Sequence, residues 1–239
     1  MRLIPAIDII GGKCVRLSQG DYDQKKEYDQ SPIEIARELE KTGYEYLHLV
    51  DLDGAKSSQP HNLYVLNQIA LETNLKIDFG GGIKSEDSLI QALRSGAHQI
   101  NIGSLAVRNP NLVKFWLLRY SPEQIVIGAD VKDGKIALNG WREVSDIDLM
   151  EFINDFADAG AKYFVCTDIS KDGMMQGSSV ELYDRIMEDF PDIKLIASGG
   201  VSSIEEIKQL ESIGVDGAII GKAIYEGLID LVELRKAFS

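Results

Sequence analysis

Two aspartates, Asp8 and Asp130, stand at matching points of two similar segments about 120 residues apart. Residues 4–15 read IPAIDIIGGKCV, and the second copy reads VIGADVKDGKIA, so each acid follows an apolar run. Two carboxylates that face each other across a substrate suit general acid–base catalysis, in which one takes a proton and the other gives one. Their environments must then separate the two pKa values. The alternative is that the acids cap loops or pair with Lys13 and Lys135.

Glycine-rich turns form a second set of matching features. FGGGIKS at 79–85 matches ASGGVSS at 197–203, and INIGS at 100–104 matches AIIGK at 218–222. Glycine lets a backbone approach an anion closely, and the helix that follows supplies N–H donors. We therefore predict two phosphate cradles for one elongated ligand, with local help from Lys84 or Lys222. The cradle residues are Gly80, Gly81, Gly82, Gly103 and Ser104 in the first half, and Ser198, Gly199, Gly200, Gly221 and Lys222 in the second.

Other polar and aromatic residues are candidates for binding. Trp141, within NGWRE, is expected either to stack on a planar heterocycle or to anchor its loop. Arg16 is expected to reach a phosphate or the ligand of Trp141. His48 is either a core histidine with a satisfied hydrogen bond or a substrate contact. Thr167 is expected to hydrogen-bond the acid at Asp130.

Asp51 and Asp168 also match between the two copies and are expected to orient other side chains rather than react. The sequence has no His/Cys/carboxylate cluster at metal-ligand spacing, no Walker lysine loop and no GxGxxG motif. We therefore expect neither a metal nor a cofactor.

Eight short apolar runs indicate the elements that position these residues. The runs are continuous rather than alternating, as is typical of parallel strands buried on both faces. They alternate with eight segments of helical pattern, which favours a (β/α)8 barrel of the α/β class over an open doubly wound sheet. The runs lie at 3–8, 45–51, 76–79, 99–103, 125–130, 162–168, 194–198 and 217–221.

Helix boundaries follow local signals. Ser-x-x-Glu boxes at Ser31, Ser178 and Ser202 predict helix starts. Glycines at 43, 96, 160 and 214 predict helix ends.

The repeat predicts a single domain over 1–239 with two half-barrels, at about 1–122 and 123–239. In this fold active sites lie at the carboxyl ends of the strands, where the candidate acids and glycines fall. Two long polar loops, 9–30 and 131–145, are placed there to close over a ligand.

Composition narrows the classes of function. The formal net charge of −13 argues against nucleic-acid binding, which needs a basic face. No apolar run approaches the ~20 residues that span a bilayer, so we expect no membrane segment. The start, MRLIPAIDII, has no signal-peptide pattern, and Cys14 and Cys166 sit among apolar neighbours. These features predict a cytoplasmic protein with reduced thiols. We expect a monomer, although the sequence does not give the oligomeric state.

Several motifs together resemble one family over essentially the whole chain. They are PAIDIIGGKCVRLSQGDY, HLVDLDGAK, GGGIKSEDS, GWRE, CTDISKDGMMQGS and SGGVSS. They are similar to the histidine-biosynthesis isomerases, the phosphoribosylformimino-5-aminoimidazole carboxamide ribotide isomerases. The resemblance implies a single-domain barrel that performs an Amadori rearrangement of an aminoaldose to an aminoketose without a cofactor. It also implies a small-molecule substrate with a phosphate on each ribose.

The resemblance assigns roles to individual residues. Asp130 matches the general acid that protonates the ring oxygen, and Asp8 matches the base that takes the C2 proton. Thr167 matches a residue that supports the acid, and Trp141 one that stacks on the imidazole carboxamide. Gly173 joins the second phosphate site. Lys84 stands where many members have arginine, so the planar fork is lost there.

Two enzyme alternatives stay open at this point. The paralogous cyclase shares the barrel, the repeat and both aspartates, but AIDIIGGKCVRL favours the isomerase. A dual-substrate isomerase that also acts on phosphoribosyl anthranilate in tryptophan synthesis is poorly separated by sequence. A non-catalytic phosphosugar-binding barrel is the alternative of another class.

Overall fold

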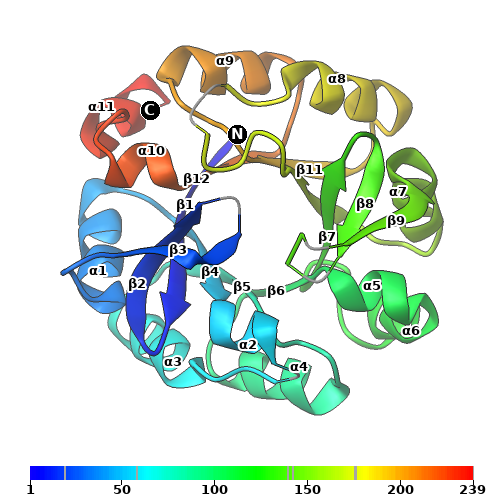
Figure 1. Cartoon of the computed structure of the whole chain (residues 1–239), viewed down its shortest axis with the longest axis horizontal. Coiled ribbons are helices and arrows are strands. Elements are labelled where there is room, and N and C mark those ends of the chain that lie inside the picture. The colour runs from blue at the N-terminus through cyan, green and yellow to red at the C-terminus, as the bar shows by residue number, and fades with distance from the viewer. Residues whose placement is uncertain (19, 58, 139, 142, 175–176, 239) are drawn as a thin grey trace. The chain divides into compact units, whose positions relative to one another are not determined.

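The computed structural model describes residues 1–239 except 19, 58, 139, 142, 175–176 and 239 (Figure 1). Eight parallel strands alternate with helices, and the fold class is the (β/α)8 barrel that the sequence predicts. Every predicted strand is present, with its ends within two residues of the predicted ones. The strands are β1 (Arg2–Ile10), β4 (Tyr46–Asp51), β5 (Lys76–Gly80), β6 (Gln99–Ile102), β7 (Ile125–Lys132), β10 (Tyr163–Asp168), β11 (Lys194–Ser198) and β12 (Gly217–Ile220).

The chain forms two compact units. Unit 2 comprises Leu3–Ile100 and Ile219–Ser239, and unit 1 comprises Met1–Arg2 and Asn101–Ala218. The single domain and its boundary near 122 remain predictions.

In unit 2, β1 pairs with β4 and β4 with β5, all parallel. The register places Ala6 beside His48, and His48 beside Asp78. In unit 1, β10 lies between β7 and β11, and β11 pairs with β12, again all parallel. Here Thr167 lies beside Asp130.

The helices cover the strands with apolar faces, and their buried residues include Trp116, Phe156 and Tyr183. None of the described helices is long and apolar enough to cross a membrane. The helices are α1 (Pro32–Thr42), α2 (Leu52–Lys56), α3 (Leu63–Glu72), α4 (Glu86–Arg94), α5 (Ser104–Arg108), α6 (Pro110–Arg119), α7 (Leu149–Asp158), α8 (Val180–Asp189), α9 (Ile204–Ser212), α10 (Lys222–Tyr225) and α11 (Leu231–Ala237).

The predicted helix signals are confirmed in part. Ser31 and Glu34 form the predicted capping box, and Gly43 ends α1 in the left-handed region with φ of 96°. The other two predicted boxes are wrong. Helix α8 follows Ser179, which makes no side-chain cap bond, and Ser203 rather than Ser202 caps α9. The shift at α9 follows from Glu206, whose carboxylate accepts from the Ser202 amide at 2.9 Å.

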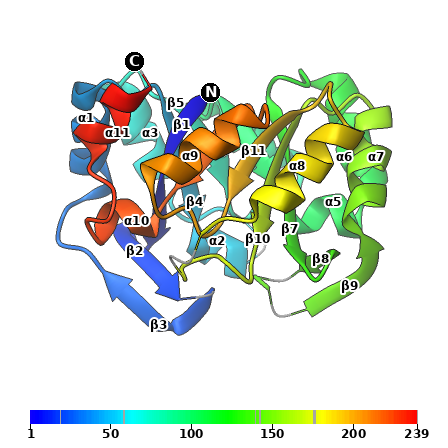
Figure 2. The same cartoon turned by 90° about the horizontal axis from the view of Figure 1, so that it is seen from above.

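The two predicted loops are instead β-ribbons. In unit 2, β1 continues antiparallel into β2 (Lys13–Ser18) and β3 (Asp21–Glu27). In unit 1, β7 continues into β8 (Lys135–Leu138) and β9 (Glu143–Asp148). Figure 2 shows the β2–β3 ribbon at the end of unit 2 that lies away from the C-terminus. Strand β3 is mostly exposed, so no buried apolar face marks it in the sequence.

The first ribbon is attached to the unit on both sides. The Tyr22 hydroxyl donates to the Leu52 carbonyl at 2.8 Å at the start of α2. The Tyr28 ring packs against that of Tyr225 with centroids 4.6 Å apart, and Lys26 pairs with Glu226 at 2.6 Å. These contacts hold the ribbon against α2 and α10.

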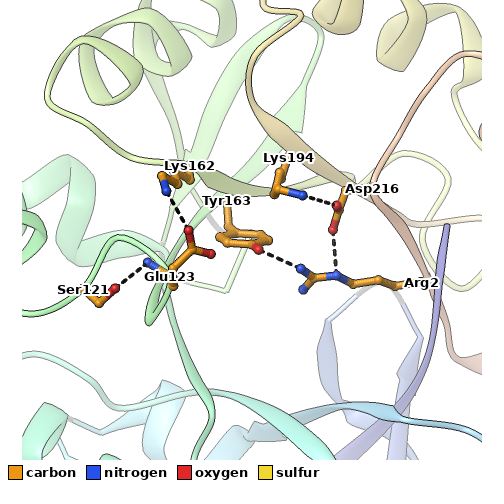
Figure 3. A network of polar contacts seen from close by, with 7 residues as sticks. All are labelled: Arg2, Ser121, Glu123, Lys162, Tyr163, Lys194 and Asp216. Carbon is orange, nitrogen blue, oxygen red and sulfur yellow. Dashed lines mark hydrogen bonds and ion pairs between the residues drawn. The ribbon is translucent and has the colours of Figure 1, made fainter.

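A polar network joins the amino ends of the strands in unit 1 (Figure 3). Arg2 donates to the Tyr163 hydroxyl at 2.7 Å and pairs with Asp216 at 2.8 Å. Lys194 reaches the same carboxylate at 3.0 Å, and Glu123 pairs with Lys162 at 2.7 Å. Since catalysis in this fold occurs at the other ends of the strands, we interpret this network as a stabilising one.

Candidate active site

Three of the predicted residues of unit 2 come together. The Arg16 guanidinium donates to the Asp8 carboxylate at 2.5 Å, and both side chains are about 15% exposed. The same guanidinium lies over Gly221, where an added Cβ would be 1.5 Å from Nη2. Arg16 therefore connects the predicted base to the predicted phosphate position before Lys222, the first residue of α10.

Asp8 is neither a loop cap nor the partner of Lys13. Lys13 pairs with Glu27 across the ribbon, and Asp8 lies within β1, two residues before its end. The predicted strand ended at Asp8 because the ribbon that extends it was not foreseen. Burial raises the pKa of the neighbouring Cys14 thiol to about 12, with a further contribution from the Asp8 carboxylate.

His48 is held by a buried acid. Its Nδ1 lies 2.6 Å from Asp78 Oδ1, and the side chains are 13% and 7% exposed. Burial alone would lower the pKa of His48, but the Asp78 carboxylate outweighs it and raises the pKa. His48 is thus a paired histidine, and whether it contacts substrate stays a prediction.

In unit 1, Asp130 and Thr167 are neighbours across the β7–β10 ladder. Asp130 is half-buried and Thr167 is 7% exposed, and the hydrogen bond between them stays a prediction. Burial, followed by the Asp130 and Asp168 carboxylates, raises the pKa of Cys166. The alternative partner, Lys135, lies 3.5 Å from Asp146 instead.

Trp141 is half-buried between β8 and β9, with φ of 70°. A bulky residue in the left-handed region is strained, and such strain concentrates at functional sites. Gly140 before it also has a positive φ, of 63°, as residues of a hairpin turn often do, so whether Trp141 stacks on a ligand or anchors its loop stays a prediction.

The central glycines of both turns are required by close packing against backbone. A Cβ at Gly81 would lie 2.1 Å from the Asp51 carbonyl oxygen, and one at Gly199 would lie 2.8 Å from that of Asp168. A Cβ added at Gly82 or Gly200 would lie 2.6 Å or 2.3 Å, respectively, from the backbone of the preceding loop. The repeat is therefore present in the structure as well as in the sequence. These glycines have a packing role whether or not they bind phosphate.

The glycines that precede α5 and α10 also match in conformation. Gly103 has φ −93° and ψ −99°, and Gly221 has φ −109° and ψ −100°. Neither helix start has a side-chain cap bond, and Ser104 is the first residue of α5. A Cβ at Gly103 would meet open space, in contrast to Gly221.

Two further predicted residues are placed individually. Gly173 has φ of 69° in the segment after β10. The Lys84 amine donates to the Ser57 carbonyl, so it ties together two loops of unit 2.

Asp51 and Asp168 bond backbone amides of the loops as well as the side chains that they are predicted to orient. Asp51 is fully buried and accepts from the amides of Gly54, His61 and Asn62 and from the Asn62 side chain, at 2.6–2.9 Å. Asp168 accepts from the backbone and hydroxyl of Ser170 and from the Ser179 hydroxyl. Their carboxylates are occupied by structural bonds.

Two buried acids were not singled out from the sequence. Asp78 pairs with His48, and Glu206 binds the Ser178 and Ser202 amides. A charged residue inside the apolar run KIDFG is a signal for Asp78. Within the described part of the chain, no group of three or more His, Cys, Asp or Glu residues could hold a metal ion.

The fold and these groups define a class of protein: a (β/α)8-barrel enzyme with its candidate acids and glycines at the carboxyl ends of parallel strands. The family model described as "Histidine biosynthesis protein" matches residues 2–230. The chain belongs to this family.

Curated relatives match over nearly their full length. A protein of Flavobacterium johnsoniae is 56% identical over 235 residues, 98% of each chain. One of Phocaeicola vulgatus is 53% identical over 236 residues, 99% of each chain. Both are named 1-(5-phosphoribosyl)-5-((5-phosphoribosylamino)methylideneamino)imidazole-4-carboxamide isomerase.

Proposed function

We propose that this protein is an intramolecular aldose–ketose isomerase of histidine biosynthesis that acts on the bisphosphorylated ribotide for which its relatives are named. The observation that carries the proposal is the full-length similarity, at 50% identity or more, to proteins with this one name. The pairing of Asp8 with Arg16 beside Gly221 supports it, because it joins a candidate base to a candidate anion site.

The proposed mechanism uses two acids in sequence. Asp130, as general acid, protonates the ring oxygen of the sugar, and the ring opens to a protonated Schiff base. Asp8, as general base, then removes the C2 proton, and the resulting enaminol tautomerises to the ketone. Thr167 supports Asp130, and Trp141 stacks on the imidazole carboxamide. No cofactor enters any of these steps.

The two phosphates of the substrate are assigned to the two glycine sets. Gly81, Gly82, Gly103 and Ser104 are proposed for one phosphate, and Gly173, Gly199, Gly200, Gly221 and Lys222 for the other. The starts of α5 and α10 support this assignment, since the cap residue of each helix is a glycine, which has no side chain to bond the N–H groups of the first turn. Arg16 is positioned to exchange Asp8 for a phosphate at Gly221.

A turnover assay with three substrates tests the proposal. The isomerase is expected to convert the ribotide aminoaldose to the aminoketose and to leave phosphoribosyl anthranilate unchanged. Turnover of both would identify a dual-substrate enzyme. Consumption of the aminoketose with ammonia, without isomerisation, would identify the cyclase, and no turnover of any of them would refute an enzyme of this kind.

We also propose that the protein works as a cytoplasmic monomer. Both candidate acids come from one chain, and both cysteines are buried and unpaired, as in a reducing compartment. Light scattering of the purified protein tests the monomer, and cell fractionation tests the location.

A further inference from the structure

Asp78 is a buried carboxylate whose direct partner is His48. It lies in the centre of β5 and is 6% exposed, and His48 is its neighbour across the β4–β5 ladder. The 2.6 Å separation between Asp78 Oδ1 and His48 Nδ1 is a short, charge-assisted distance. A buried carboxylate is costly without such a partner, so loss of either member would leave the other unfavourably buried.

The pair lies on the same face of the sheet as Asp8. In the β1–β4 ladder, Ala6 is the partner of His48 and Asp8 is the partner of Val50. Side chains two residues apart on a strand share a face, so Asp8 and His48 are diagonal neighbours there. The half-buried positions of β4 alternate in the same way, at His48 and Val50.

We propose that Asp78 is a positioning residue that acts through His48: it accepts Nδ1–H and favours the imidazolium, whose Nε2–H then donates to a substrate oxygen beside Asp8. This inference rests on the proposed isomerase function. A neutral imidazole has only one N–H, so donation from both nitrogens requires the imidazolium. Asp78 therefore fixes both the ring orientation and the charge of His48.

The charged groups around His48 support this assignment. Burial opposes the imidazolium, Asp78 on β5 and Asp8 on β1 favour it, and Arg16 on β2 opposes it, with a raised His48 pKa as the result. The imidazolium thus persists above the ordinary titration range of histidine, near pH 6.5. As pH rises through the raised pKa, the second donor is lost.

The first test compares Asp78→Asn with the unaltered protein. The substitution keeps a hydrogen-bond acceptor for Nδ1 but removes the charge. We expect kcat/KM to fall about 10- to 100-fold, as for loss of a charged hydrogen-bonding partner. The alkaline limb of the pH profile should move to lower pH, and the His48 ring, followed by NMR, should titrate at lower pH than in the unaltered protein. His48→Gln assigns its signal among the three histidines.

Three variants separate positioning from stability. Asp78→Glu keeps the negative charge. The alkaline limb of its pH profile should therefore lie closer to that of the unaltered protein than the limb of Asp78→Asn does. Asp78→Asn in the His48→Gln background should cause no further loss of kcat/KM, since the partner is already gone. Asp216→Asn removes another mostly buried, paired carboxylate. It should lower the stability of the protein and leave the alkaline limb of the pH profile where it is.

Two results would overturn the inference. One is an Asp78→Asn variant in which both the alkaline limb of the kcat/KM profile and the titration of His48 are the same as in the unaltered protein. The other, which needs no variant, is a His48 in the unaltered protein that titrates at or below the ordinary value. If the unaltered protein does not isomerise the ribotide, the proposed function fails, while the titration still shows whether Asp78 sets the charge of His48.

Discussion

The guanidinium of Arg16 donates to the Asp8 carboxylate at 2.5 Å and at the same time covers Gly221. A substrate phosphate at Gly221 would compete with the carboxylate for this cation. In the proposed mechanism, Arg16 would therefore couple binding of phosphate at Gly221 to the electrostatic environment of the proposed base.

Arg16→Met tests this coupling. We expect kcat/KM to fall about 100-fold, equivalent to about 2.7 kcal/mol, because both the phosphate contact and the partner of Asp8 are lost. Arg37→Met is the matched control, since Arg37 pairs with Glu72 between surface helices. Equal activity in the two variants would contradict the role of Arg16.

Gly81→Ala should destabilise the protein strongly. Its Cβ would lie 2.1 Å from the Asp51 carbonyl oxygen, and φ is 100°. We expect a loss of about 2–4 kcal/mol in urea unfolding, from overpacking together with backbone strain. Gly11→Ala is the control, because its Cβ meets open space at φ of 56° and should cost only about 1 kcal/mol. Similar losses for both would show that packing against Asp51 is unimportant.

Tyr163→Phe removes the hydroxyl that Arg2 contacts at 2.7 Å in the network of Figure 3. Tyr163 is the first residue of β10, whereas Thr167 lies near the other end of that strand. We expect a loss of about 1–3 kcal/mol in stability with kcat/KM unchanged. Thermal unfolding and the isomerase assay measure the two effects, and a large loss of turnover would reject a purely stabilising network.

Both thiols should be unreactive in the folded protein. Burial, with help from Asp8, raises the pKa of Cys14 to about 12, and burial raises that of Cys166 as well. At pH 8 the reactive thiolate is therefore scarce as well as inaccessible. We expect an aromatic disulfide reagent to titrate neither cysteine in buffer and both in denaturant. Rapid reaction of either thiol in buffer would mean that the segment around it opens.

The parallel strands could be predicted from the sequence because their apolar runs are continuous and end in matching residues. The offset between Gly81 and Gly199 identified the repeat, and the structure shows the same backbone contact at both. The ribbons were not foreseen, because β3 is polar and gains its position from contacts such as Tyr28 with Tyr225. Such contacts between distant segments leave no periodic pattern in a sequence.

The candidate site was predictable in its residue types more than in its contacts. Asp8 and Arg16 are eight residues apart, and only the antiparallel turn of β1 into β2 brings them together. An acid inside a short apolar run indicates a buried charge at Asp78, but it does not indicate which residue pairs with that charge. Its importance comes from the register that places it beside His48.

Turnover of the ribotide by Asp8→Asn and Asp130→Asn, each checked for unaltered secondary structure by circular dichroism, tests the central claim most directly. Each variant keeps the shape of the side chain but can no longer take or give a proton. We expect kcat to fall by about 10²- to 10⁴-fold in each, with the protein still folded. Turnover near that of the unaltered protein in either variant would contradict a mechanism in which these two carboxyl groups move the protons.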